Sequence, residues 1–243
     1  MSPTPRLRVF AGPNGSGKST VKAMISERLL GLYINPDDIE KEIRRFDFLN
    51  LQHYGIQTNQ TEILSFFQQS PLIIKAELED DVQALRFNDN KLIFVNVDIN
   101  SYLASVAADF IRQKSLQSLT SFTFETVMSS PDKIELFKQA QSLGYRTYLY
   151  YIATDDPTIN CSRVAHRVKM GGHPVPQNKI ISRYHRSLHL LREAVRHTHR
   201  AYIFDNSQDQ MIWIAEITNG HDLEFRSAYV PHWFSQAMGL PSA

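Results

Sequence analysis

The chain has 243 residues, of which 42% are hydrophobic and 21% charged, and its formal net charge is +1. This length suits one large domain or a domain with an insertion, and the balanced charge excludes a polybasic tail and an acidic solvating protein. The single cysteine, Cys161, excludes an internal disulfide framework and a cysteine-rich metal site. Without a long apolar run or a signal peptide, the sequence predicts a cytoplasmic protein with no membrane segment.

Strand-like and helix-like segments alternate along the chain. Apolar runs predict strands at 7–11, 32–34, 121–124, 147–153 and 201–204. Helical spacing and helix-start signals predict helices at 18–30, 101–116 and 157–170, and further helices that begin near 37, 130 and 176. Ser130 is expected to cap its helix, and residues 92–97 fit either a strand or the entry to a helix. The alternation predicts an α/β fold with a parallel sheet covered by helices on both faces.

The predicted organisation is a single domain, 1–243, with two distinctive segments. Residues 47–98 interrupt the alternation and are acidic, which predicts a mainly helical insertion. Residues 157–200 are predicted to form a basic lid and a long helix. From 160 to 200 the chain has nine Lys and Arg against a single acid, Glu193. Such a basic block suits a site for an anion, and the alternative is a solvated helix face.

One motif is typical of phosphate binding. Residues 12–19, GPNGSGKS, match G-x-x-x-x-G-K-[ST] at every fixed position, directly after a predicted strand and at the start of a helix. The glycines let backbone N–H groups point at phosphates, Lys18 reaches the β- and γ-phosphates, and the Ser19 hydroxyl ligates Mg²⁺. The sequence therefore predicts a protein that binds a nucleoside triphosphate, taken to be ATP, with Mg²⁺. The predicted nucleotide-binding residues are Gly12, Pro13, Asn14, Gly15, Ser16, Gly17, Lys18, Ser19 and Thr20.

Missing motifs narrow the class of nucleotide-binding protein. A motor or ABC-type ATPase needs an apolar strand that ends in adjacent acids, and a GTPase needs an N-K-x-D motif, and the sequence has neither. The remaining class is a P-loop kinase, in which a hydroxyl group of a second substrate attacks the γ-phosphate. Two alternatives stay open, namely a nucleotide or polynucleotide kinase and a regulatory nucleotide-binding module.

Polar residues at the ends of two predicted strands are candidates for the acceptor side of such a site. Asp37 follows the strand at 32–34, where its carboxylate can take the proton of an acceptor hydroxyl; alternatively, Asp37 or Asp38 only caps the next helix. Glu125 and Thr126 end the strand that begins at 121, and we expect them to bind substrate hydroxyls or hydrated Mg²⁺ rather than only to end the strand.

The basic lid supplies candidates for the phosphate side. Arg163 and Arg167 are four residues apart and share one helix face without an acidic partner at helical spacing. Phosphoryl oxygens match the fork of donors that arginine offers, so the pair is expected to brace the γ-phosphate. Gly171 and Gly172 predict a hinge or lid edge, from which His173 can reach the phosphates.

Taken together, these motifs resemble the zeta toxin family of P-loop kinases. The similar segments are GPNGSGKST (12–20), INPDDI (34–39), FTFETVMS (122–129), RVAHRVKMGGHPVP (163–176) and IISRYHRSL (180–188). The resemblance implies a kinase-like fold and ATP-dependent phosphorylation of a sugar nucleotide such as UDP-N-acetylglucosamine, with nucleic acid not expected as a partner. It also implies a toxin restrained by an antitoxin protein. It assigns the triphosphate grip to Lys18 and Ser19, the base to Asp37, the substrate side to Glu125 and Thr126, and the γ-phosphate cations to Arg163, Arg167 and His173.

Overall fold

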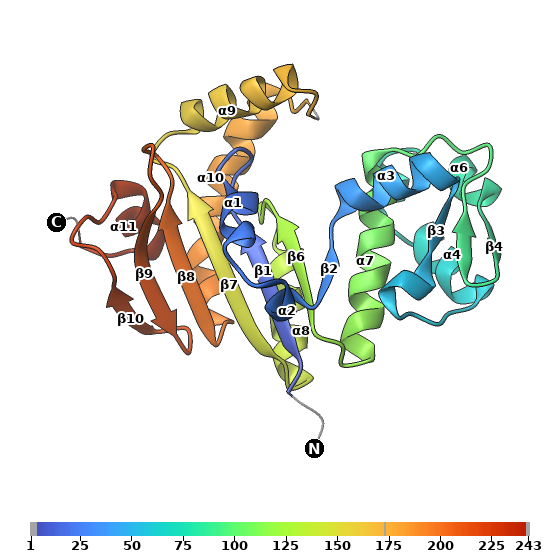
Figure 1. Cartoon of the computed structure of the whole chain (residues 1–243), viewed down its shortest axis with the longest axis horizontal. Coiled ribbons are helices and arrows are strands. Elements are labelled where there is room, and N and C mark those ends of the chain that lie inside the picture. Colours follow the sequence, from blue (N-terminus) through green and yellow to red (C-terminus); the bar gives the residue numbers. More distant parts are fainter. Residues whose placement is uncertain (1–3, 173, 242–243) are drawn as a thin grey trace. The chain divides into compact units, whose positions relative to one another are not determined.

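The computed structural model describes residues 4–172 and 174–241, and the chain divides into two compact units (Figure 1). The first unit comprises Met1–Gly31 and Thr123–Ala243, and the second comprises Leu32–Phe122. The second unit is therefore one continuous stretch that interrupts the sequence of the first. Its bounds are wider than the insertion expected at 47–98.

A mostly parallel sheet forms the centre of the first unit. Its strands lie in the order β10-β9-β8-β7-β1-β6. The central strands β1 and β7 pair in parallel, as do β7 and β8. The α/β class and its parallel core are therefore as predicted. The strand bounds are β1 (Arg6–Ala11), β6 (Phe122–Thr126), β7 (Arg146–Ala153), β8 (Arg200–Asp205), β9 (Ile212–Thr218) and β10 (Asp222–Phe225).

Two strands at one edge of this mostly parallel sheet run antiparallel to their neighbours. Strand β9 pairs antiparallel with β8, and β10 pairs antiparallel with β9. The connections are short, and short loops join antiparallel neighbours, whereas a parallel neighbour would need a crossover of a dozen residues or more. The sequence analysis assigned no strand to residues 212–225.

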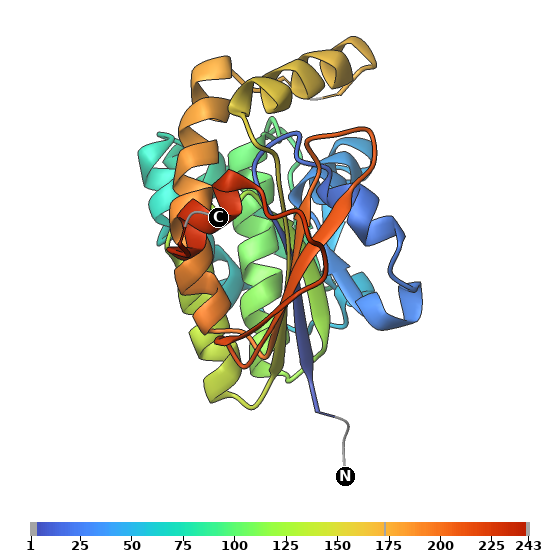
Figure 2. The same cartoon turned by 90° about the vertical axis from the view of Figure 1, so that its left-hand side faces the viewer.

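Helices cover both faces of this sheet (Figure 2). Helix α1 (Lys18–Ala23) packs against β1 on one face, while α8 (Asp132–Ser142) and α10 (Gln177–Arg196) lie on the other. Helix α9 (Pro157–Lys169) precedes α10 in the chain and contacts it, and α11 (His232–Met238) packs against α10. Buried side chains such as Phe10, Leu149 and Ile203 fill the layers between strands and helices.

Two local predictions were wrong. The helix expected over 18–30 is divided into α1 and α2 (Glu27–Leu30), because Ser26 adopts an extended ψ of 133° and the helix begins anew after it. Ser130 does not cap α8. The residue before that helix is Pro131, whose φ and ψ are already helical, and no side chain caps its first turn.

The second unit combines helices with a small sheet. Helices α3 (Pro36–Phe46) and α7 (Ser101–Gln117) pack together and bury apolar residues such as Ile39 and Leu103. Strand β2 (Leu32–Ile34) precedes α3, and the residues that fit a strand or a helix at 92–97 form a strand only as far as 93. The remaining elements are β3 (Phe48–Asn50), β4 (Arg86–Asn88), β5 (Lys91–Ile93), the 3-10 helix η1 (Leu51–Tyr54), α4 (Gln60–Gln68), α5 (Pro71–Lys75) and α6 (Glu79–Ala84). Strand β5 pairs antiparallel with both β3 and β4, so the segment 47–98 contains a sheet as well as helices.

The parallel strands place the candidate residues of the first unit at one edge of the sheet. The carboxyl ends of parallel strands meet at the same edge, and ligands of open α/β sheets bind there. The phosphate loop follows β1, Glu125 and Thr126 end β6, α9 follows β7, and Asn206 follows β8. Within the described residues, none of the helices has the length and apolar character that crossing a membrane requires.

Candidate functional site

The loop between β1 and α1 has the backbone shape of a phosphate cradle. Its three glycines, Gly12, Gly15 and Gly17, have φ values of 142°, 73° and 99°, a region that side-chain-bearing residues rarely adopt. The Ser16 amide donates to the Pro13 carbonyl at 3.3 Å and closes a turn within the loop. These conformations explain why the motif needs glycine at these positions.

Polar atoms of the loop indicate a site for a polar ligand. The Lys18 ammonium donates to the carbonyl oxygens of Gly12 at 2.8 Å and Pro13 at 3.0 Å. Asn14 Oδ1 and Ser16 Oγ are buried and form no hydrogen bond with any part of the chain that the structure describes. Buried polar atoms are nearly always paired, and the Ser16 hydroxyl is a donor, so it fits a loop that binds an oxygen-rich ligand such as a polyphosphate.

Two asparagines from outside the loop hold its backbone. Asn160 of α9 donates from Nδ2 to the Asn14 carbonyl at 2.7 Å, and Asn206 after β8 donates from Nδ2 to the Ser16 carbonyl at 2.8 Å. Neither asparagine is among the site residues predicted from the sequence. The available signal was that Asn160 lies four residues before Val164 on the predicted helix and so shares its apolar face, where an amide must find partners.

Glu125 lies beside the serine that is expected to hold Mg²⁺. The Ser19 hydroxyl donates to Glu125 Oε2 at 3.4 Å, and Lys22 Nζ lies 3.8 Å from Glu125 Oε1. Oxygen donors of this kind suit Mg²⁺, so Ser19 and Glu125 are residues that could hold it. Thr126 contributes its carbonyl to the Gly12 amide at 3.2 Å, and its hydroxyl oxygen accepts from the Met128 amide at 3.0 Å.

Helix α9 brings Asn160 to the loop and Arg163 to Asn206, which holds the loop. Its first turn is capped by Asp156, whose carboxylate accepts from the Thr158 amide at 2.6 Å, and the hydrogen bonds to Thr158 lower the pKa of Asp156. One turn after Asn160, Arg163 Nη1 donates to the Asn206 carbonyl at 2.7 Å, so this guanidinium lies beside the residue that holds the loop. Arg167 lies one turn further along, and its carbonyl accepts from the Gly172 amide at 2.9 Å where the helix ends.

Three predicted site residues are not brought to this loop by the described contacts. The first is Arg167, whose described neighbour is Gly172, at the end of α9 that is remote from Asn160. Asp37 belongs to the second unit, where it lies exposed in the first turn of α3. The cap of α3 is Asn35, whose side chain accepts from the Asp37 amide at 2.9 Å, so neither Asp37 nor Asp38 fills that role. The Asp37 carboxylate has no hydrogen bond or ion pair within residues 4–172 and 174–241, and its role as the base stays a prediction. His173 lies outside the described residues.

Asp205, at the end of β8, anchors the segment that carries Asn206. Its fully buried carboxylate accepts from the Ser207 amide at 3.0 Å, the Ser207 hydroxyl at 2.8 Å and Trp233 Nε1 at 2.7 Å. The Asn206 amide in turn donates to the Ala153 carbonyl at 2.9 Å. These contacts make Asp205 a structural residue rather than a reader of the nucleotide base.

Comparison with known proteins adds a family to this geometry. The family described as zeta toxin matches residues 96–218, just over half of the chain. The chain belongs to the zeta toxin family. Among curated proteins, none matches its sequence. The family match covers β6, which carries Glu125 and Thr126, and α9, which carries Arg163 and Arg167. It also covers α10 and β8, whereas the phosphate loop lies outside the matched range.

Solved structures show where this zeta toxin chain stands among known folds. A chain in the crystal structure of AvrRxo1-ORF1:-ORF2 with ATP has a TM-score of 0.55 and 14% identity, over 98% of this chain and 64% of that one. A chain of the PezAT toxin–antitoxin system of Streptococcus pneumoniae has a TM-score of 0.46 and 15% identity, over 87% of this chain and 72% of that one. The zeta toxin chain thus spans just under two thirds of the AvrRxo1 chain, which it resembles in fold.

Proposed function

We propose that this chain is an ATP-dependent kinase of the zeta toxin type, which transfers the γ-phosphate of ATP to a hydroxyl group of a small molecule. One observation carries the proposal: a complete phosphate loop has Glu125 3.4 Å from its serine hydroxyl and an arginine of the basic lid beside it. The loop supplies N–H donors, and the carboxylate and Ser19 supply oxygen ligands for a metal ion. Phosphoryl transfer depends on this combination of positioning and charge neutralisation.

The proposed reaction assigns a separate task to each side chain. The acceptor oxygen attacks the γ-phosphorus, the bond from phosphorus to the bridging oxygen breaks, and ADP leaves with the electron pair. The acceptor proton passes to the Asp37 carboxylate. Lys18 holds the β- and γ-phosphates, and Arg163 and Arg167 neutralise the charge that spreads over the transferred group. Ser19 and Glu125 would hold Mg²⁺, which would supply positive charge to offset that of the phosphates.

For the acceptor, we propose a sugar nucleotide of the UDP-N-acetylglucosamine kind, bound through Glu125 and Thr126, while His173 contacts the phosphate that is transferred to it. The family resemblance supports this choice, and so do the polar groups that end β6 beside the loop. We further propose that the chain is the toxin of a toxin–antitoxin pair and acts in the cytoplasm, where ATP and sugar nucleotides are available. The AvrRxo1 relative crystallised as an ORF1:ORF2 complex, which makes a protein partner a reasonable expectation.

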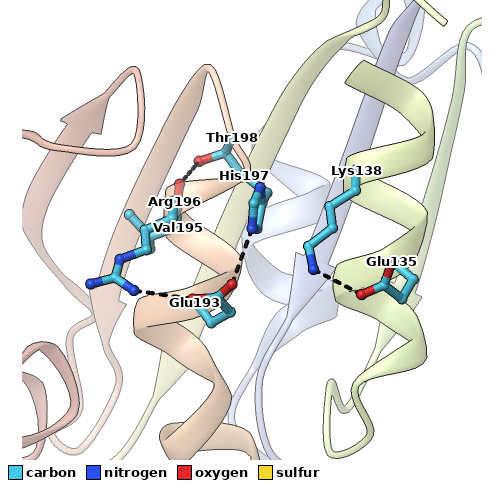
Figure 3. Close-up of polar contacts among 7 residues, drawn as sticks. All are labelled: Glu135, Lys138, Glu193, Val195, Arg196, His197 and Thr198. Atoms are coloured by element: carbon cyan, nitrogen blue, oxygen red, sulfur yellow. Dashed lines mark hydrogen bonds and ion pairs between the residues drawn. The ribbon is translucent and has the colours of Figure 1, made fainter. Parts of the chain in front are cut away.

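The contacts of the basic block argue against a polynucleotide kinase. Figure 3 shows that Arg196 and His197 both engage Glu193, at 3.2 Å and 3.1 Å, near the end of α10. The hydrogen bond from His197 has the largest effect in lowering the pKa of Glu193, and the one from Arg196 lowers it further. Arg200 lies 3.2 Å from Glu216. Arg196 and Arg200, at the end of the basic block, are thus engaged by acids, which reduces the positive charge that this end offers to a nucleic-acid backbone.

The test is incubation of the purified chain with Mg²⁺–ATP and a panel of sugar nucleotides, followed by mass spectrometry for an acceptor that gains one phosphate. Lys18→Ala should abolish both nucleotide binding and transfer. Asp37→Asn should abolish transfer and leave ATP binding nearly unchanged. The matched control is Asp38→Asn, since the neighbouring carboxylate is also exposed in α3 but pairs with Lys41 at 3.3 Å.

Three results would contradict parts of the proposal. Transfer by Asp37→Asn at the wild-type rate would remove that residue from the mechanism. Phosphorylation of short oligonucleotides, falling steeply with salt, would favour the polynucleotide kinase. Slow ATP hydrolysis without any phosphorylated acceptor, together with a protein that binds only the ATP form, would favour a regulatory module.

A further inference from the structure

The direction in which the phosphate loop presents its amides is set by groups outside the loop. In a trans peptide the C=O of one residue and the N–H of the next point in opposite directions. None of the described peptide bonds is cis. The Asn14 carbonyl is held by Asn160, so the Gly15 N–H points away from α9. In the same way, the Ser16 carbonyl is held by Asn206, so the Gly17 N–H points away from that side chain.

Each asparagine is itself fixed by further contacts. Asn160 is fully buried, and its Oδ1 accepts from the Thr154 hydroxyl at 2.5 Å, which leaves Nδ2 directed at the loop. Asn206 is held through its main chain, because its amide donates to Ala153 and its carbonyl accepts from Arg163. The two donors therefore approach the loop from firmly bonded positions rather than from mobile side chains.

The packing around the loop glycines shows how closely these residues approach. A Cβ atom added at Gly15 would lie 2.8 Å from the Asn160 carbonyl oxygen and 3.3 Å from a methyl group of Val164. A Cβ atom added at Gly17 would lie 2.3 Å from Asn206 Nδ2. The space that any side chain would need is thus taken by the residues that hold the backbone.

We propose that Asn160 and Asn206 are positioning residues that turn the Gly15 and Gly17 amides into the hollow of the loop, toward the phosphates of the bound nucleotide. This inference rests on the proposed function. The two asparagines contact loop carbonyls, and the effect on the nucleotide passes through the peptide plane. Because loop amides of this motif surround the phosphates that ADP and ATP share, both nucleotides depend on them alike. Asn160 also lies on the helix that carries Arg163 and Arg167, so one element sets the loop and carries the arginines.

The test compares the affinities of the full chain for ADP and for ATP, by calorimetry with Mg²⁺ present. Asn160→Asp keeps the acceptor for Thr154 but replaces the donor to Asn14 with an oxygen. Asn160→Leu removes both groups without adding charge. Asn206→Asp removes the second donor. Each variant should bind ADP and ATP about tenfold more weakly at pH 8, the effect of one hydrogen bond. Asn59→Asp, which retains an acceptor at the N-cap of α4, is the matched control and should bind normally.

A pH series separates this role from simple damage to the fold. As the pH falls, the new carboxyl of Asn160→Asp becomes protonated and can donate again, so its affinity relative to the wild type should recover, whereas that of Asn160→Leu should not. Wild-type affinity in the Asp and Leu variants, or no recovery at low pH, would overturn the inference. A wild-type chain that binds neither ADP nor ATP would instead refute the proposed function itself.

Discussion

Replacing Asp205 tests whether one buried carboxylate anchors the end of β8. The Asp205 carboxylate accepts hydrogen bonds from three donors, which all lose their partner in Asp205→Ala. These donors are the Ser207 amide, the Ser207 hydroxyl and the indole N–H of Trp233. Trp233 is only 2% exposed, so water cannot replace the lost acceptor there. Ser207 is less buried and can turn to water.

The magnitude follows from that difference in exposure. An unsatisfied buried donor costs about 1–3 kcal/mol, and each bond that water can replace costs about 0.5–1 kcal/mol. Removal of a buried charge returns part of that free energy. We therefore expect Asp205→Ala to lower the free energy of unfolding by about 2–3 kcal/mol, measured by urea denaturation and tryptophan fluorescence.

The matched control is Asp209→Ala, which removes an exposed carboxylate from the loop that follows Asp205 and should change the free energy of unfolding by less than about 0.5 kcal/mol. A second readout is Asp155, whose pKa is raised by burial and further by Asp205. In Asp205→Ala the pKa of Asp155 should fall toward the usual aspartate value, as followed by carboxyl NMR. A loss of stability no larger than that of the control would refute the anchoring role.

Three further predictions concern the same unit. Gly15→Ala should abolish nucleotide binding, because the new Cβ meets Asn160. The control Gly55→Ala has a similar φ of 66° but lies in open space, so it should cost only about 1 kcal/mol of backbone strain and leave binding intact. Equal nucleotide binding by the two variants would contradict this prediction. Asp156→Ala should lower the melting temperature at pH 7, while Asp156→Asn keeps the cap. Because the pKa of Asp156 is lowered in the folded state, its stabilising effect is present above its unfolded pKa and is lost as pH falls through the folded pKa. The difference in melting temperature between wild type and Asp156→Ala should therefore disappear in acid. A difference that does not change with pH would exclude the carboxylate as its cause. Tyr184→Phe should destabilise by about 1–3 kcal/mol in urea titrations, since the buried Thr154 carbonyl loses its 2.6 Å donor; an unchanged midpoint would show that the carbonyl finds another partner.

Local patterns in the sequence were enough to predict the central elements. The phosphate loop is a continuous stretch whose glycines, lysine and serine have fixed spacing, and the apolar runs of β1, β7 and β8 stand out because both of their faces are buried. The edge strands β9 and β10 were missed. The reversal between β8 and β9 has no strong turn motif. Between β9 and β10, Asn219 and Gly220 have positive φ values and form a hairpin signal that was overlooked, and β10 has several exposed residues.

The site itself was only partly accessible to such reasoning. Arg163 could be selected from helical spacing and charge, but its partner is a carbonyl 43 residues further along the chain. Asn160 lies 146 residues from the carbonyl that it holds. Contacts of this kind arise only when strands and helices assemble, so composition and periodicity contain no direct record of them.

The spacing of the polar side chains along α9 has a consequence for insertions and deletions. Asn160, Arg163 and Arg167 recur every three to four residues, and a helix turns about 100° with each residue. One extra residue inserted between Asn160 and Arg163 would leave the loop contact in place and rotate both guanidinium groups by more than a quarter of a turn. For the proposed phosphoryl transfer, the angular phase of this single helix therefore matters as much as the identity of its side chains.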